Sequence, residues 1–304
     1  MDFVQYWFMF PTAILVATTA MLSGIGGGAL FTPIFLIIFP LLGPGYPLES
    51  TIAAIGAALL TQTFGFASGF IGYWRKGLID VRCALPFIAV AVPVAVIGAL
   101  VAHRVDGTAL KGAYAVLMGV LALVMLRRSG TPGETAIDDG ALPKDSPERP
   151  GTGTDLRAIT DRSGQTYTYH VPRQGIGAIT TAVGAFFTGL VSTGIGEVIM
   201  SQLVKRNRVP VAVAAATSVL IVIATAAAAS ATQVSGLILK GGVTAVPWNL
   251  VFYTIPGVLI GGQLGPHLQG RVSQTAMVRA IGTLFVVIGL AMAWIVSGEL
   301  GLGR

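Results

Sequence analysis

The chain has 304 residues, of which 54% are hydrophobic and only 11% are charged. Soluble proteins carry about a quarter charged residues, so this composition excludes a soluble enzyme or binding domain and indicates a polytopic membrane protein. The net charge of +6 marks cytoplasmic loops in such a protein, rather than a surface for nucleic acid. The single cysteine, Cys83, excludes an internal disulfide.

Apolar stretches close to the length that a membrane-spanning helix needs, about 20 residues, occur four times in each half of the chain. They cover Phe3–Leu22, Thr51–Gly72, Ala84–Ala102, Ala109–Leu126, Gly175–Ser192, Val209–Ala231, Val243–Gly262 and Ala280–Ser297. A much shorter apolar segment follows the first span of each half, at Ala29–Leu42 and at Glu197–Val204. We therefore expect an all-α membrane protein with five helical segments per half, one of them short or broken.

The one clearly aqueous stretch, residues 129–174, separates a first transmembrane repeat (1–128) from a second (175–304). It begins with a segment rich in Gly, Pro, Asp and Glu, which is typical of a flexible linker. Tyrosine and threonine then alternate over residues 166–169, after a turn sequence at 161–164, and this pattern predicts a small β-hairpin. His170 has no ligand partner at useful spacing, so we expect an exposed strand histidine there.

The two halves share markers at constant spacing, which indicates an internal duplication. The Gly-Ile-Gly sequences at 24–26 and 194–196 are offset by 170 residues. Further along, the offset is 163 residues for three pairs: Pro47 with Pro210, Pro93 with Pro256, and Gly98 with Gly261. Hydrophobic segments that are interrupted at matching positions of two halves are a pointer to a transporter's binding site.

The distribution of Lys and Arg predicts the orientation. If each short segment returns to the side from which its preceding helix came, eleven Lys and Arg fall on one side of the membrane and four on the other. The positive-inside rule then makes the 129–174 loop cytoplasmic and places both termini outside. Five segments per half is an odd number, so the two halves are expected to be inverted relative to each other.

Each glycine break ends in a short helix whose first N–H groups have no intrahelical acceptor, an arrangement that suits an anion. Glycine also lets the backbone approach a ligand closely. We expect the two breaks to enclose one small anion, with neutral donors from neighbouring helices. The candidate residues are Gly24, Gly26, Gly27, Gly28, Thr61, Gln62, Thr193, Gly194, Gly196, Gln202, Thr217 and Ser218. The alternative is that these glycines and hydroxyls only allow helices to pack closely.

Glu197 is the only acidic residue in either glycine-rich segment. An intramembrane carboxylate is a functional hypothesis by default. Two roles are open for Glu197: it carries a proton during symport, or it caps the N-terminus of the short second-half helix.

At these residues the chain resembles the TauE/SafE family of membrane permeases, which are also described as sulfite exporters. The resemblance rests on GIGGGALFTP in the first half, and on TGIGEVIMSQL and AAATSV in the second. Its second glycine motif departs from the family pattern by having Glu197, and by having Leu203 where the first half has Pro33. The resemblance implies transport of small sulfur oxyanions or organosulfonates such as sulfite, thiosulfate or sulfoacetate.

We therefore expect a secondary transporter of a small sulfur-containing anion in a bacterial inner membrane, without a cofactor and not an enzyme. A channel or a carrier for another small anion or carboxylate is the alternative. The expected partners are the anion and the lipid bilayer, with a homodimer as one option for assembly and no nucleic acid. No nucleotide-binding GxxxxGK[ST] motif is present, so direct coupling to ATP would need another chain.

Overall fold

The computed structural model describes residues 3–23, 26–128, 156–162, 164–170, 175–206, 209–268 and 274–301. The chain is an all-α polytopic membrane protein with one small hairpin. Its helices are α1 Met9–Ser23, α2 Gly28–Pro33, α3 Phe39–Leu42, α4 Thr51–Lys76, α5 Val81–Ala102, α6 Gly107–Arg128, α7 Gly175–Val191, α8 Ile195–Ser201, α9 Val211–Gly241, α10 Trp248–Leu268 and α11 Gln274–Glu299. Its strands are β1 Leu156–Thr160 and β2 Thr166–His170.

Five of these helices are long and apolar enough to cross a membrane: α4, α5, α6, α9 and α11. Helix α10 has 21 residues but is not one of these five. The expected full spans at Phe3–Leu22 and Gly175–Ser192 are shorter as helices, because α1 has 15 residues and α7 has 17. At the N-terminal side the reason is local: Phe3–Tyr6 forms a separate 3₁₀ turn, and α1 begins only at Met9.

Helix ends follow ordinary capping chemistry. Ser50 accepts the N–H of Ala53 at 3.1 Å to start α4, and Gly77, at φ +74°, ends it. Asp80 accepts the N–H of Cys83 at 3.0 Å to start α5. Prolines lie inside α5 and α10, as membrane helices tolerate.

Both short segments turn back towards the end of the bundle from which they came. Gln5 and Tyr6, just before α1, donate to the carbonyls of Gly45 and Tyr46, just after α3, at 2.6 and 3.0 Å. In the second half, the amide of Gln202 donates to Thr180 of the preceding helix at 2.7 Å. In each segment a short α-helix continues into a π-helical turn, Ile34–Ile38 or Gln202–Arg206. Such turns are often found at functional sites.

The helices of the two halves pack on one another rather than as separate bundles. Helix α1 packs on α10 and α7 packs on α5; α4 packs on α10 and α9 on α5. The remaining large contacts join α4 to α9 and α6 to α11. The helices of the two halves can be matched in order, α1, α2, α4, α5 and α6 with α7, α8, α9, α10 and α11. Under this matching, the α1–α10 pair corresponds to the α7–α5 pair, and the α4–α10 pair to the α9–α5 pair. The α4–α9 and α6–α11 pairs each correspond to themselves.

Two glycines show how closely the matched pairs pack. A Cβ at Gly98 of α5 would lie 2.2 Å from the carbonyl oxygen of Phe186 in α7. A Cβ at Gly261 of α10 would lie 2.4 Å from the carbonyl oxygen of Ile14 in α1. Only glycine permits this backbone approach, and these two residues form one of the pairs at the 163-residue offset.

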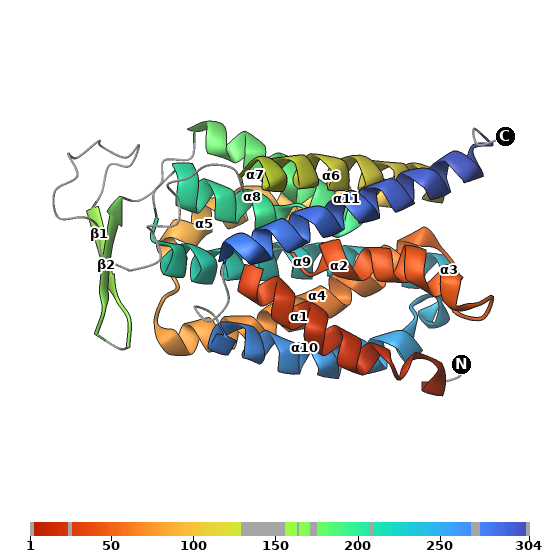
Figure 1. Cartoon of the computed structure of the whole chain (residues 1–304), viewed down its shortest axis with the longest axis horizontal. Coiled ribbons are helices and arrows are strands. Elements are labelled where there is room, and N and C mark those ends of the chain that lie inside the picture. Colours follow the sequence, from red (N-terminus) through yellow and green to blue (C-terminus); the bar gives the residue numbers. More distant parts are fainter. Residues whose placement is uncertain are drawn as a thin grey trace.

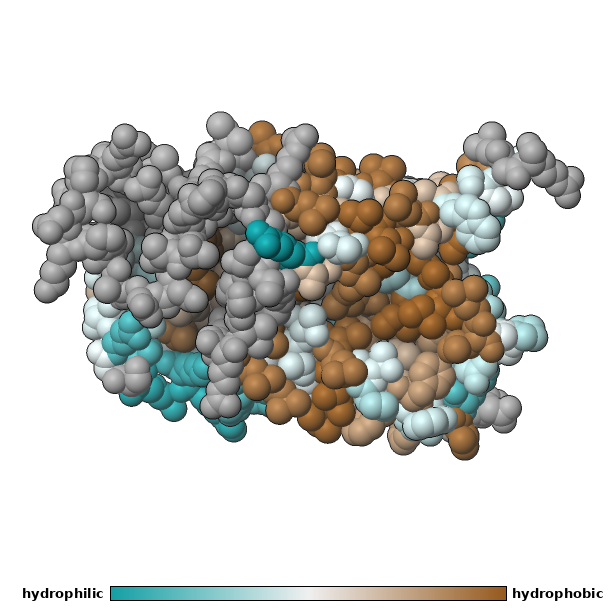
Figure 2. All heavy atoms as spheres, viewed as in Figure 1, coloured by the Kyte–Doolittle hydropathy of each residue, from teal (hydrophilic) through white to brown (hydrophobic). Residues whose placement is uncertain are grey.

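The predicted β-hairpin is present: β1 and β2 pair antiparallel, with Arg157 opposite Tyr169. Along β2, Tyr169 is buried and Thr168 is exposed, which agrees with the expected alternation. The hairpin lies at one end of the helix bundle, and the start of α1 and the end of α11 lie at the other (Figure 1). Apolar side chains cover the middle of the face in Figure 2, and hydrophilic side chains gather towards the hairpin end.

Candidate functional site

The two glycine-rich breaks are in contact. The N–H of Gly26 donates to Oε1 of Glu197 at 3.3 Å, and the hydroxyls of Thr32 and Ser192 are 2.5 Å apart. A Cβ at Gly28 would lie 1.9 Å from the carbonyl oxygen of Ser192, so any other residue there would separate the breaks. Residues 160 or more positions apart in sequence thus form one buried polar centre.

Side-chain oxygens accept hydrogen bonds from the backbone N–H groups at the start of α2. Glu197 accepts the N–H of Gly26, and Oε1 of Gln62, on α4, accepts the N–H of Gly28. These N–H groups belong to the helix terminus, where donors lack intrahelical acceptors. A carboxylate and an amide oxygen therefore sit where the oxygens of a bound anion would be expected.

The second break has a strained backbone. Ser192 adopts φ +66°, the one non-glycine residue with positive φ in the described part of the chain, and Gly194 adopts φ +133°. The hydroxyl of Thr188 accepts the N–H of Ile195 at 2.9 Å and so closes the loop at the start of α8. Backbone strain of this kind clusters at functional sites, where the surrounding structure holds it.

Two buried polar atoms at this centre have no hydrogen-bond partner within the described ranges: Oε2 of Glu197 and Oγ1 of Thr193. The two side chains are 6% and 1% exposed. Neither described salt bridge involves Glu197. Buried polar atoms without partners are costly, so a further hydrogen-bonding group at this pair would be stabilising.

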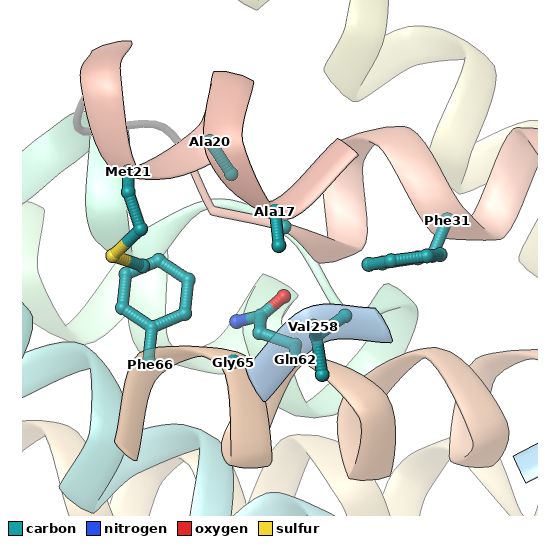
Figure 3. Close-up of a pocket in the computed structure, with 9 residues that line it drawn as sticks. Ala17, Ala20, Met21, Phe31, Gln62, Gly65, Phe66 and Val258 are labelled. Atoms are coloured by element: carbon teal, nitrogen blue, oxygen red, sulfur yellow. The ribbon is translucent and has the colours of Figure 1, made fainter. Parts of the chain in front are cut away.

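A small cavity adjoins the first break (Figure 3). Its volume is about 10 Å³, room for roughly one water molecule. The walls are mainly apolar, and in Figure 3 the Gln62 amide lies among Ala17, Met21, Phe31 and Val258. No oxyanion fits this volume, so binding one requires the helices or side chains here to move.

The structure brings together eight of the candidate residues. Gly26, Gly27, Gly28 and Gln62 form the first-half part, and Thr193, Gly194, Gly196 and Glu197 form the second. Gly24 lies outside the described residues. Within these ranges no group of three or more His, Cys, Asp or Glu side chains converges that would suit a metal ion.

The other four candidates make hydrogen bonds elsewhere. The hydroxyl of Thr61 pairs with that of Thr254 on α10 at 2.8 Å, and Gln202 bonds to Thr180 and Thr181. Thr217 accepts the N–H of Asp80 at 3.1 Å. Ser218 donates to the carbonyl of Ala215, one turn back in its own helix, at 2.8 Å. These contacts are of the packing type that we held as the alternative for each such residue.

The sequence pattern did not single out four residues that shape the centre. Three of them are hydroxyl residues within a few positions of the glycine motifs: Ser192, Thr32 and Thr188. Their closeness to the motifs in sequence is the feature that could have indicated them. Tyr114 on α6 donates to the carbonyl of Ala29 at 2.8 Å. It had no such signal, because it lies far from both breaks in sequence.

The comparisons with known proteins agree with this architecture. The family model described as sulfite exporter TauE/SafE matches residues 9–292, which is nearly the whole chain and includes both glycine breaks. Neither the curated proteins nor the solved structures contain a match to the chain. The chain therefore belongs to the sulfite exporter TauE/SafE family, and it is a multi-pass membrane transporter rather than an enzyme.

Proposed function

We propose that the protein is a secondary transporter of a small sulfur-containing anion, such as sulfite, thiosulfate or an organosulfonate, in a bacterial inner membrane. One observation carries the proposal: acceptor oxygens of Glu197 and Gln62 cover the backbone N–H groups of Gly26 and Gly28. An oxyanion presents the same kind of acceptor, and glycine leaves the backbone accessible to it. The substrate would replace at least one of these side chains as the partner of the helix terminus.

Exchange of partners also explains why Glu197 is there. An ionised carboxylate and a bound anion repel each other in a medium of low dielectric constant. Binding therefore requires Glu197 to become protonated or to turn away from Gly26. A protonated Glu197 could keep its place and donate to the substrate, which would couple one proton to each anion. This mechanism makes Glu197 the proton carrier and leaves Thr193 as a neutral donor beside it.

The helix arrangement supports alternating access by two inverted repeats, 1–128 and 175–304, joined by a 129–174 linker. The matched packing pairs and the return of both short segments agree with five segments per half. The charge distribution favours a cytoplasmic linker and external termini. On this plan the contact between the breaks lies near the middle of the membrane, where inverted-repeat transporters bind their substrates.

A channel or a carrier for another small anion or carboxylate is the competing function. The test is counterflow in proteoliposomes that contain the purified protein and are preloaded with unlabelled sulfite. A carrier accumulates labelled sulfite transiently against its gradient, whereas a channel does not. Thiosulfate and sulfoacetate should compete with labelled sulfite, and chloride and acetate should not. Equal competition by acetate would contradict the sulfur-anion assignment, and absence of any transient accumulation would contradict a carrier.

A further inference from the structure

A second buried carboxylate, Asp80, lies in the turn between α4 and α5. It is 4% exposed. Its Oδ1 accepts the N–H of Cys83 at 3.0 Å, and Nη1 of Arg157 donates to both carboxylate oxygens at 2.6 and 2.7 Å. The hydroxyl of Tyr169 donates to Oδ2 at 2.5 Å. The backbone N–H of Asp80 donates to Oγ1 of Thr217 at 3.1 Å.

These bonds join three parts of the fold at one residue. Asp80 belongs to the α4–α5 turn, Thr217 lies on α9, and Arg157 and Tyr169 are opposite each other in the β-hairpin. A further bond from the N–H of Arg162 to the carbonyl of Lys76, at 3.2 Å, ties the hairpin turn to the end of α4. The hairpin is thus bound to the end of α4 and to Asp80, and the backbone N–H of Asp80 in turn contacts α9 through Thr217.

The carboxylate is ionised in this arrangement. Burial by itself raises the pKa of Asp80, but hydrogen bonds from Tyr169, Arg157 and the Cys83 N–H outweigh it, and the pKa falls below its usual value. A buried ion pair adds little net stability compared with apolar packing, but removing one partner is costly. Such a pair serves better to hold two parts in one defined arrangement than to stabilise the fold.

The opposite end of the bundle has no equivalent fastening among the described residues. The turn matched with the α4–α5 turn is the one between α9 and α10, and residues 242–247 contain no carboxylate. This turn lies at the other end, because Lys240 at the end of α9 donates to the carbonyl of His103 at the end of α5, at 2.8 Å. The two matched turns therefore differ in this charged attachment.

We propose that the β-hairpin is a latch that keeps its end of the transporter closed by binding Asp80 through Arg157 and Tyr169. While the latch is engaged, Arg157 and Tyr169 hold Asp80 in the position from which its N–H donates to Thr217 of α9, so the α4–α5 turn stays against α9 and the substrate centre opens only towards the other end. Release of Arg157 and Tyr169 from Asp80 frees this turn and allows the hairpin side to open. The proposal rests on the proposed transport function, because it assumes that the two ends open in turn.

The test measures how readily the hairpin end opens, without any substrate. In a Cys83→Ala background, a single cysteine replaces Ala215, which is 5% exposed on α9 close to Thr217. The rate of its reaction with a hydrophilic maleimide in detergent reports opening. Asp80→Asn keeps the helix cap, since Asn caps as well as Asp, and removes the charge that binds Arg157. Arg157→Gln removes the same ion pair from the hairpin side without touching any helix.

We expect both variants to react about tenfold faster than the parent, which corresponds to losing a charged hydrogen bond. The matched control is Glu299→Gln, which breaks the ion pair between Lys111 on α6 and Glu299 on α11. It should leave the rate unchanged, and Arg157→Lys should restore part of the parent behaviour. Parent-like rates in both Asp80→Asn and Arg157→Gln, or an equal increase in Glu299→Gln, would overturn the latch. The labelling rate is measured without sulfite. If the parent protein shows no sulfite counterflow, that result would therefore refute the anion assignment and not the latch.

Discussion

Gly26 and Glu197 are 171 residues apart, yet the N–H of one donates to the carboxylate of the other at 3.3 Å. This bond joins the start of the short helix in the first half to the first turn of the short helix in the second. In the proposed mechanism, this bond makes Glu197 an internal occupant of the anion site. The terminus that Glu197 contacts belongs to the first-half helix, whereas the capping role expected from the sequence was at its own helix α8, and proton transport by Glu197 stays a prediction.

Glu197→Gln separates these roles. Glutamine resembles the protonated carboxyl and can still accept the Gly26 N–H, so we expect sulfite counterflow to persist while uptake no longer responds to a pH gradient. If Glu197 only caps the helix, the substitution instead lowers stability by about 1 kcal/mol or less. The measurement compares counterflow with gradient-driven uptake in the same proteoliposome preparation. Gradient dependence equal to that of the parent would remove Glu197 from coupling.

Gly28→Ala should abolish transport. The new Cβ would lie 1.9 Å from the Ser192 carbonyl oxygen, so the two breaks must separate at a cost of about 1–3 kcal/mol. Gly26→Ala should fold normally, because its Cβ would lie 3.8 Å from Glu197 Oε1. Gly112→Ala, with nothing within 4 Å, is the matched control for both. Thermal midpoints and counterflow rates would be compared, and a parent-like Gly28→Ala would refute the close contact.

Substituting the two matched packing glycines should have matched effects. Gly98→Val and Gly261→Val each push a side chain into the backbone of a neighbouring helix that lies 2.2 or 2.4 Å from the Cβ position. We expect each to lower the thermal midpoint in detergent by several degrees, as a loss of about 1–3 kcal/mol would do. Gly119→Ala has open space and should change little. A large effect at only one of the two glycines would contradict equivalent packing of α5–α7 and α10–α1.

The latch should be insensitive to pH across the physiological range. The pKa of Asp80 is lower in the folded protein than its ordinary value of 3.8, so its contribution is present above that value and is lost only as pH falls through the lowered pKa. Burial and the hydrogen bond to Asp80 raise the pKa of Tyr169, which keeps its hydroxyl protonated. Labelling at position 215 should therefore stay flat between about pH 5 and 8 after correction for the thiolate fraction. A rise in that window would point to a different titrating group.

The proposed orientation is tested by single cysteines at two exposed positions, in the Cys83→Ala background. Thr168 is exposed on the hairpin and Leu300 is exposed beyond the end of α11. In intact cells an impermeant maleimide should label position 300 and should reach position 168 only after the membrane is opened. Labelling of both from the same side would exclude the inverted arrangement.

The sequence was informative where its pattern was local. The glycine breaks, the short segments after them and the period-two pattern of the hairpin all depend on neighbouring residues, and each is present in the structure. The length of α1 was overestimated, because hydropathy does not register the 3₁₀ turn that precedes it.

The composition of the site was less predictable. In a helix that is apolar on every side, hydropathy does not say which way Thr61 or Gln62 points. Only Gln62 reaches the glycine break, while Thr61 bonds to α10. The bonds of Tyr114 to Ala29 and of Arg157 to Asp80 join residues 85 and 77 positions apart. Such pairs depend on how helices pack, and no local pattern encodes them.

The exchange of partners between the halves has a consequence for assembly in the cell. The grooves at Gly98 and Gly261 are each filled by a helix from the other half. When the first half emerges from the ribosome, α5 has no α7 to pack against and α1 has no α10. Those surfaces stay in contact with lipid until the linker and the second half have been synthesised. Both grooves are therefore filled only when nearly the whole chain has been made, because α10 is the second-last helix.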